Sequence, residues 1–157
     1  MLKTSKDPND HKLIKNLGPE PLGNNFSGDY LFKKSRKKSL PIKNFIMDSK
    51  IVVGVGNIYA NEALFMAGIR PTKKSGLISK VKFEELSHAI VITLREAIEA
   101  GGTTLKDYTN AEEAPGYFKK ELKVYDRGGE NCVKCNKKLK EIRQANRQTV
   151  YCSTCQN

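Results

Sequence analysis

The chain has 157 residues, of which 38% are hydrophobic and 29% are charged, and none is Trp. A chain of this length can form one core with a small appendage, burying roughly 70% of its unfolded surface, and its composition is that of a globular protein. It has no apolar run near the ~20 residues of a membrane span and no apolar signal core at its start. These features exclude a membrane partner and predict a soluble, cytoplasmic protein.

Charge is unevenly distributed along this basic chain, in which 28 Lys and Arg against 17 Asp and Glu give a net charge of +11. Residues 31–50 carry seven basic residues and one acidic residue, and residues 119–157 carry ten and four, so each segment has a net charge of +6. Residues 81–113 carry three and seven, a net charge of −4. A charge run is usually only a solvated surface, but two basic segments in so basic a chain favour nucleic acid as partner.

The first 50 residues contain three expected short helices. An apolar pattern over residues 13–17 indicates one short helix in a linker rich in Asn, Asp, Pro and Gly. Ser27 is suited to cap a second helix over residues 28–37. Pro41 fits the first turn of a third helix over residues 40–48.

A glycine-containing turn precedes the next helix. Residues 51–53 look like a strand that enters the turn over residues 54–56, and Asn57 is placed to cap a helix that Gly68 ends. A dinucleotide site would need a third glycine where Tyr59 stands, so that interpretation is rejected. Small residues before a helix still let backbone N–H groups approach a phosphate, and a DNA backbone phosphate would serve.

The longest expected helix follows a cap at Ser79 and runs as far as two consecutive glycines, with apolar residues at helical spacing. Residues 103–117 then form a polar loop, and residues 122–125 an extended segment that leads to the cysteines. His11 and His88 are isolated in the sequence, which favours core or surface roles over metal binding.

All four cysteines of the chain lie in two Cys-x-x-Cys pairs separated by sixteen residues: Cys132, Cys135, Cys152 and Cys155. This spacing predicts one structural zinc ion in a closed tetrahedral shell, with no open position for catalysis. A redox dithiol normally follows a strand and opens a helix, and two disulfides would need an oxidising compartment, so both alternatives are less favoured.

A basic stretch between the two pairs suits a β-hairpin with its turn near Ala145, which would place Arg147 beside the tip. The sequence therefore predicts a mainly α fold, a DNA-binding helical bundle followed by a small β-hairpin zinc finger with four cysteine ligands.

Several segments carry a family resemblance. Residues 43–48 (KNFIMD) and 52–65 (VVGVGNIYANEALF) resemble the helix–two-turns–helix motif of bacterial formamidopyrimidine-DNA glycosylases. The similarity extends through further segments and covers nearly the whole chain: residues 18–22, 96–105, 115–118, 124–125 and the cysteine finger.

The resemblance implies base excision repair, in which the enzyme flips an oxidised purine out of duplex DNA, cleaves its glycosidic bond and nicks the abasic strand. It implies that Asn57 and Arg147 hold phosphates around the lesion and that Lys43 faces DNA. The implied partner is double-stranded DNA containing oxidised purines or abasic sites, bound by a monomer with one structural zinc ion. A loop over about residues 108–117 would cover the flipped base, through Tyr108, Pro115, Gly116 and Tyr117.

The start of the chain departs from the family pattern. The family's nucleophile is the amine of an N-terminal proline followed by glutamate, whereas this sequence begins Met1-Leu2-Lys3 and all its prolines lie within the chain. We therefore expect the DNA-binding half of a glycosylase, without base excision by this chain alone and with a separate or missing N-terminal catalytic domain. Residues 1–24 would be a linker or remnant of that domain, 25–118 the helix–two-turns–helix domain and 119–157 the zinc finger.

Two alternatives share these motifs. Endonuclease VIII-like enzymes favour oxidised pyrimidines, and the Pro-Gly-Tyr sequence at residues 115–117 argues against them. A free-standing, non-catalytic zinc module that binds DNA or RNA is disfavoured by the length of the glycosylase match.

Overall fold

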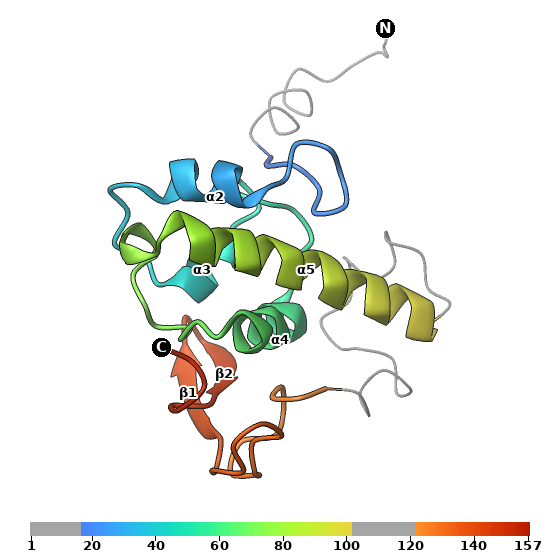
Figure 1. Cartoon of the computed structure of the whole chain (residues 1–157), viewed down its shortest axis with the longest axis vertical. Coiled ribbons are helices and arrows are strands. Elements are labelled where there is room, and N and C mark those ends of the chain that lie inside the picture. Colours follow the sequence, from blue (N-terminus) through green and yellow to red (C-terminus); the bar gives the residue numbers. More distant parts are fainter. Residues whose placement is uncertain (1–16, 102–121) are drawn as a thin grey trace, which may run out of the picture.

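The computed structural model describes residues 17–101 and 122–157. Figure 1 shows the long helix α5 running across the molecule, with α2 on one side, α4 on the other and the hairpin beyond α4. The mainly α fold with a small β-hairpin is thus confirmed for the described residues. Its elements in chain order are α2 (Gly28–Ser35), α3 (Ile42–Met47), α4 (Asn57–Ala67), the 3-10 helix η1 (Ser75–Leu77), α5 (Lys80–Gly101), β1 (Lys140–Gln144) and β2 (Arg147–Tyr151).

Two sequence predictions concern residues outside the described part of the chain. The short helix expected over residues 13–17 lies almost entirely outside the described residues, and the loop over residues 103–117 lies wholly outside them. Within the described residues, no helix is both long and apolar enough to cross a membrane.

The N-terminal caps of α2 and α5 are the predicted ones. Ser27 Oγ accepts a hydrogen bond from the backbone N–H of Tyr30 at 3.1 Å, and Ser79 Oγ accepts one from the backbone N–H of Lys82 at 3.2 Å. Helix α2 ends two residues earlier than expected, because Arg36 has extended dihedrals and Lys37 is left-handed with φ 68°.

Two turns, and no strand, connect α3 to α4. The expected strand over residues 51–53 is wrong: the backbone N–H groups of Ile51 and Val52 both donate to the carbonyl of Asp48, which closes a turn. Ile51 and Val52 are still buried, so their apolar character reflects core packing from an irregular segment. A second turn follows at Gly54, whose φ of 83° favours glycine.

Helix α4 begins one residue earlier than predicted. Gly56 is its N-cap, and no side chain caps it, so Asn57 is the first helical residue rather than the cap. Its side chain is used elsewhere, as described below. Gly68 ends the helix as expected, with a left-handed φ of 72° and its N–H donated to the carbonyls of Leu64 and Phe65.

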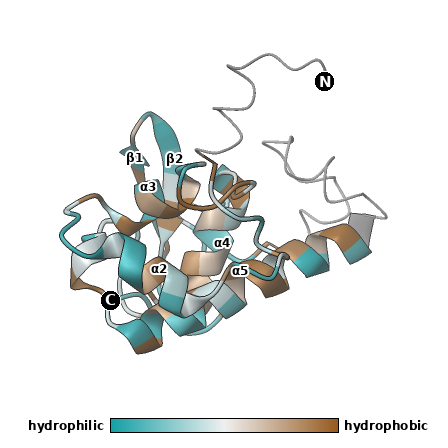
Figure 2. Cartoon of the chain, turned by 90° about the horizontal axis from the view of Figure 1, so that it is seen from above, coloured by the Kyte–Doolittle hydropathy of each residue, from teal (hydrophilic) through white to brown (hydrophobic). Residues whose placement is uncertain are grey.

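Helix α4 is the centre of the fold, since ten of its eleven residues are buried. Helix α5, by contrast, carries both hydrophobic and hydrophilic residues along its length, as Figure 2 shows. Three of the buried residues of α4 are polar: Asn57, Asn61 and Glu62. Buried polar groups need hydrogen-bond partners, and each of these three side chains has at least one partner in the C-terminal segment.

The C-terminal segment, residues 122–157, is called the finger below. Its hairpin pairs β1 with β2 in antiparallel register, from Lys140 opposite Tyr151 to Gln144 opposite Arg147. Ala145 and Asn146 form the turn with φ of 52° and 64°, which confirms the predicted turn position. Residues 122–125, expected to be extended, instead enter a turn. The finger's small core uses Phe65 of α4.

Candidate metal centre and nucleic-acid interface

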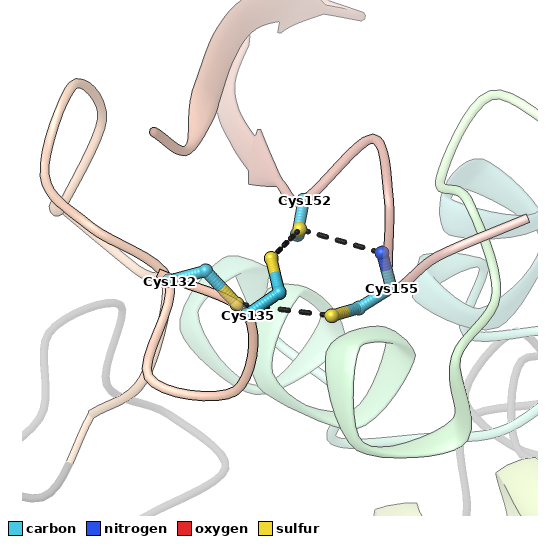
Figure 3. A group of neighbouring side chains, drawn as sticks. All are labelled: Cys132, Cys135, Cys152 and Cys155. Atoms are coloured by element: carbon cyan, nitrogen blue, oxygen red, sulfur yellow. Dashed lines mark hydrogen bonds between the residues drawn. The ribbon is translucent and has the colours of Figure 1, made fainter. Parts of the chain in front are cut away.

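The four cysteines come from two loops of the finger, and their side chains point toward one another (Figure 3). All four sulfur atoms lie within 4.8 Å of one another. The Cys135 and Cys152 sulfurs are 3.4 Å apart and those of Cys132 and Cys155 are 3.9 Å apart. All four cysteines are free thiols rather than disulfides. The convergence of the two pairs that the spacing predicts is therefore confirmed.

This arrangement fits a tetrahedral metal ion. Zinc–sulfur bonds of about 2.3 Å place the sulfurs roughly 3.8 Å apart, which lies inside the observed range. Backbone N–H groups also point at sulfur in each pair, from Lys134 to Cys132 and from Cys155 to Cys152, both at 3.4 Å. Four thiols positioned in this way can hold one metal ion.

Ionisation of one thiol is already favoured. Burial opposes it at Cys152, but hydrogen bonds from the backbone N–H groups of Cys155 and Thr154 and from the Cys135 thiol lower its pKa to about 7. The thiolate is the form that binds metal.

The second cysteine loop is fastened to the end of α4. Gln156 is buried, and its side chain accepts from the Cys152 N–H at 2.8 Å and donates to the Ile69 carbonyl at 2.9 Å. Arg70 donates to the carbonyl of Ser153 at 2.8 Å. The cysteine end of the finger is therefore positioned by the helical layer.

Lys43 of α3 was expected to face DNA, but its side chain is buried in the protein with 1% of its surface exposed. Its Nζ donates to Thr149 Oγ1 at 2.7 Å and to the carbonyl of Gln148 at 3.3 Å. Burial, and secondarily the positive charge of Arg147, lowers its pKa to about 8. In this structure Lys43 fastens strand β2 to α3.

Asn57 and Asn61 reach the same part of β2 from α4. Asn57 Nδ2 donates to the Gln148 carbonyl at 3.1 Å. Asn61 Nδ2 approaches that oxygen at 3.5 Å, while Asn61 Oδ1 accepts the N–H of Val150 at 2.8 Å. The contacts of Lys43, Asn57 and Asn61 with residues 148–150 are called the joint below. One carbonyl oxygen thus has donors from all three side chains.

Glu62 is a functional candidate that sequence reasoning missed. It is 7% exposed, and its carboxylate accepts three backbone N–H groups, from Lys123, Val124 and Tyr125, at 2.8, 2.9 and 2.8 Å. An acidic residue in a helix without a polar face is the signal that could have found it. Glu62 holds the entrance of the finger against α4.

Arg147 is exposed and follows the hairpin turn directly, as predicted. It borders a hollow of about 170 Å³ between the tip of the hairpin and α3. The other residues lining the hollow are Lys43, Asn44, Met47, Asp48, Gln144 and Ala145. Lys43, one of the residues of the joint, therefore lies close to Arg147. The lesion-loop residues, Tyr108, Pro115, Gly116 and Tyr117, lie outside the described residues.

Two turns between packed helices, with a four-cysteine finger docked on the second helix, define a helix–two-turns–helix protein that can hold a metal. Residues 17–109 match the family described as formamidopyrimidine-DNA glycosylase H2TH domain. The chain belongs to this family, which confirms the resemblance seen in its sequence.

Curated relatives share most of this sequence. The formamidopyrimidine-DNA glycosylase of Marinomonas sp. (strain MWYL1) is 55% identical over 157 residues, which is 100% of this chain and 58% of the relative. That of Idiomarina loihiensis is 54% identical over 156 residues, 99% of this chain and 58% of the relative. The chain thus spans little more than half the length of these relatives.

Solved structures of the same name share the fold. The Lactococcus lactis Fpg in complex with abasic-site DNA is 33% identical, with a TM-score of 0.81 over 94% of this chain and 54% of that one. The complex of L. lactis Fpg (MutM) with Fapy-dG-containing DNA gives 32% and 0.79 over the same shares of the two chains. The MutM (Fpg) protein from Thermus thermophilus is 35% identical, with a TM-score of 0.81 over 96% of this chain and 57% of that one.

Proposed function

We propose that this chain is the part of a formamidopyrimidine-DNA glycosylase that binds duplex DNA, with Asn57 and Arg147 holding backbone phosphates. The observation that carries the proposal is the joint. Asn57 stands at the N-terminus of α4 and bonds the carbonyl of Gln148, the residue next to Arg147. The fold therefore fixes the distance between a helix N-terminus and an exposed arginine from the finger.

Each of the two sites suits a phosphate for a different reason. The first turn of α4 presents backbone N–H groups that have no partner within the helix, together with the positive end of its dipole. Arg147 offers a delocalised cation that binds phosphate oxygens with two parallel hydrogen bonds. Lys43 belongs to the same site as a buried cation that holds β2 in position beneath Arg147.

We further propose that the four cysteines bind one structural zinc ion, because four thiols at these distances suit its tetrahedral preference and leave no open position. The whole enzyme would act on DNA containing oxidised purines or abasic sites as a monomer. Its catalytic domain would precede these residues or be supplied separately. Tyr108, Pro115, Gly116 and Tyr117 would cover the flipped base.

The two proposed phosphate sites, at Asn57 and at Arg147, are together called the clamp below. The clamp is tested by the salt dependence of DNA binding by Arg147→Ala. Each lost phosphate contact lowers the slope of log affinity against log salt by about 0.9, so we expect weaker binding and a slope smaller by about one. Fluorescence anisotropy with a duplex containing an abasic-site analogue measures both. Lys138→Ala, at the cysteine end of the finger, is the control and should leave the slope unchanged. An unchanged slope in Arg147→Ala would remove Arg147 from the clamp.

A further inference from the structure

We propose that a second basic surface extends the DNA contact beyond the clamp onto the flanking duplex. It consists of Lys37, Lys38, Lys73 and Lys74, and is called the basic corner below. This inference rests on the proposed DNA-binding function, and it assigns to these lysines a separate stretch of the DNA backbone.

Backbone hydrogen bonds bring two segments, 35 residues apart in sequence, together at this corner. The N–H of Gly76 donates to the carbonyl of Lys38 at 2.9 Å, and the N–H of Ile42 donates to the carbonyl of Lys73 at 2.7 Å. An isolated antiparallel bridge pairs Pro41 with Lys74 between them. The backbones of the two lysine pairs are thus held side by side on the structure.

No acidic side chain from either segment offsets this charge, since residues 30–47 and 63–83 contain no Asp or Glu. Lys37, Lys38 and Lys74 are exposed and Lys73 is half-buried. Nearby Asp29 is already bonded to Lys33 and Lys80, at 3.1 and 3.3 Å. None of the ion pairs between described residues involves the basic corner. Four like charges held together without an anion fit a polyanion.

The basic corner is continuous with the clamp. The carbonyl of Pro71 accepts a hydrogen bond from Gln144 Nε2, at the hairpin tip, at 3.1 Å, and one from the N–H of Lys43 at 3.2 Å. Lys73 is two residues further along, a backbone distance of at most about 7 Å. Phosphates along one strand of B-DNA advance by about 3.4 Å per base pair. A duplex held by Arg147 would therefore reach the basic corner within a few base pairs.

The experiment compares two DNA duplexes. One has about 10 base pairs, enough to contact only the clamp, and the other has about 25 base pairs, with flanking DNA on both sides of the clamp. The test variant is Lys37→Gln/Lys38→Gln/Lys74→Gln. The matched control, Lys123→Gln/Lys137→Gln/Lys138→Gln, removes three exposed lysines of the finger that lie outside its β-hairpin. Circular dichroism checks that both variants keep the helices.

We expect the wild type and the control to bind the long duplex more tightly than the short one, with a steeper salt slope. In the test variant this difference should vanish, and the slope on the long duplex should fall by about 2 to 3, while binding of the short duplex is unchanged. A test variant that keeps the full length advantage overturns the inference. Loss of wild-type binding to both duplexes would instead overturn the proposed DNA-binding function.

Discussion

Lys43 is held almost completely away from water, although lysine is among the side chains least often buried. Its ammonium group has two acceptors, Thr149 Oγ1 and the Gln148 carbonyl, but no carboxylate. Burial of this charge, and then repulsion from Arg147, lowers its pKa to about 8. The lysine therefore holds the finger in place and at the same time carries a penalty that depends on pH.

The sign of this pH dependence follows from proton binding. Between about pH 8 and pH 10.5 the unfolded chain keeps the Lys43 proton while the folded chain loses it, so stability rises with pH in this window. We expect the free energy of unfolding of the wild type, relative to Lys43→Met, to rise by on the order of 2 kcal/mol across it. Urea denaturation of both proteins at about pH 7.5 and about pH 10 measures the difference. Parallel changes in the two proteins would contradict the assigned pKa.

The sequence identified Asn57 and Arg147 as residues of interest but could not place Lys43 correctly. A lysine in a basic segment is indistinguishable in sequence from its exposed neighbours. Only the packing of β2 on α3, a contact between residues more than 100 positions apart, removes it from solvent. The phosphate-binding roles of Asn57 and Arg147 stay predictions, and Asn57 was wrongly expected to cap α4.

At the scale of elements, local sequence patterns predict some features of the helices and turns and miss others. Four features depend only on neighbouring residues, and the sequence predicts them correctly. They are the helix caps at Ser27 and Ser79, the helix end at Gly68 and the hairpin turn. The apolar run at residues 51–53 is wrongly predicted to be a strand, because residues buried in an irregular turn are as apolar as those of a buried strand. The partners of the polar residues of α4 lie in the finger, far away in sequence, so no local pattern predicts these contacts.

Glu62 joins α4 to the entrance of the finger through three hydrogen bonds. A buried carboxylate that accepts three backbone N–H groups is strongly stabilising, and Glu62→Gln turns an amide donor toward at least one of those donors. We expect a loss of about 2 to 4 kcal/mol in the free energy of unfolding. The control Glu84→Gln, on the exposed face of α5, should change it by less than about 0.5 kcal/mol. Similar losses in both variants, measured by chemical denaturation, would show that the carboxylate is not a special contact.

For the whole molecule, two separate apolar clusters divide the fold. The larger one lies mainly among the helices, whereas the smaller one, between the finger and α4, contains only a few residues: Phe65, Val124, Cys132, Leu139, Val150 and Cys152. Two of these six are candidate metal ligands. We therefore expect a finger with so small a core to depend on a bound metal ion for its folding, and the helices not to.

Removing the metal should therefore separate the two parts. We expect chelation to abolish amide protection in β1 and β2 while α4 and α5 stay protected, and to cause only a small loss of helical circular dichroism. Hydrogen exchange read by mass spectrometry, before and after a strong zinc chelator, measures this directly. Restoration by added zinc is the control. If the hairpin stays protected without metal, the joint and the small core suffice to hold it.

The acceptor at the centre of the joint is a main-chain oxygen. Because every amino acid carries the same carbonyl, substitutions of the Gln148 side chain leave it in place, whereas losses at Lys43, Asn57 or Asn61 remove a donor. A survey of tolerated mutations would therefore score position 148 as permissive and its three partners as restricted. A comparison of side chains would therefore not detect the atom that connects the two parts of the proposed clamp.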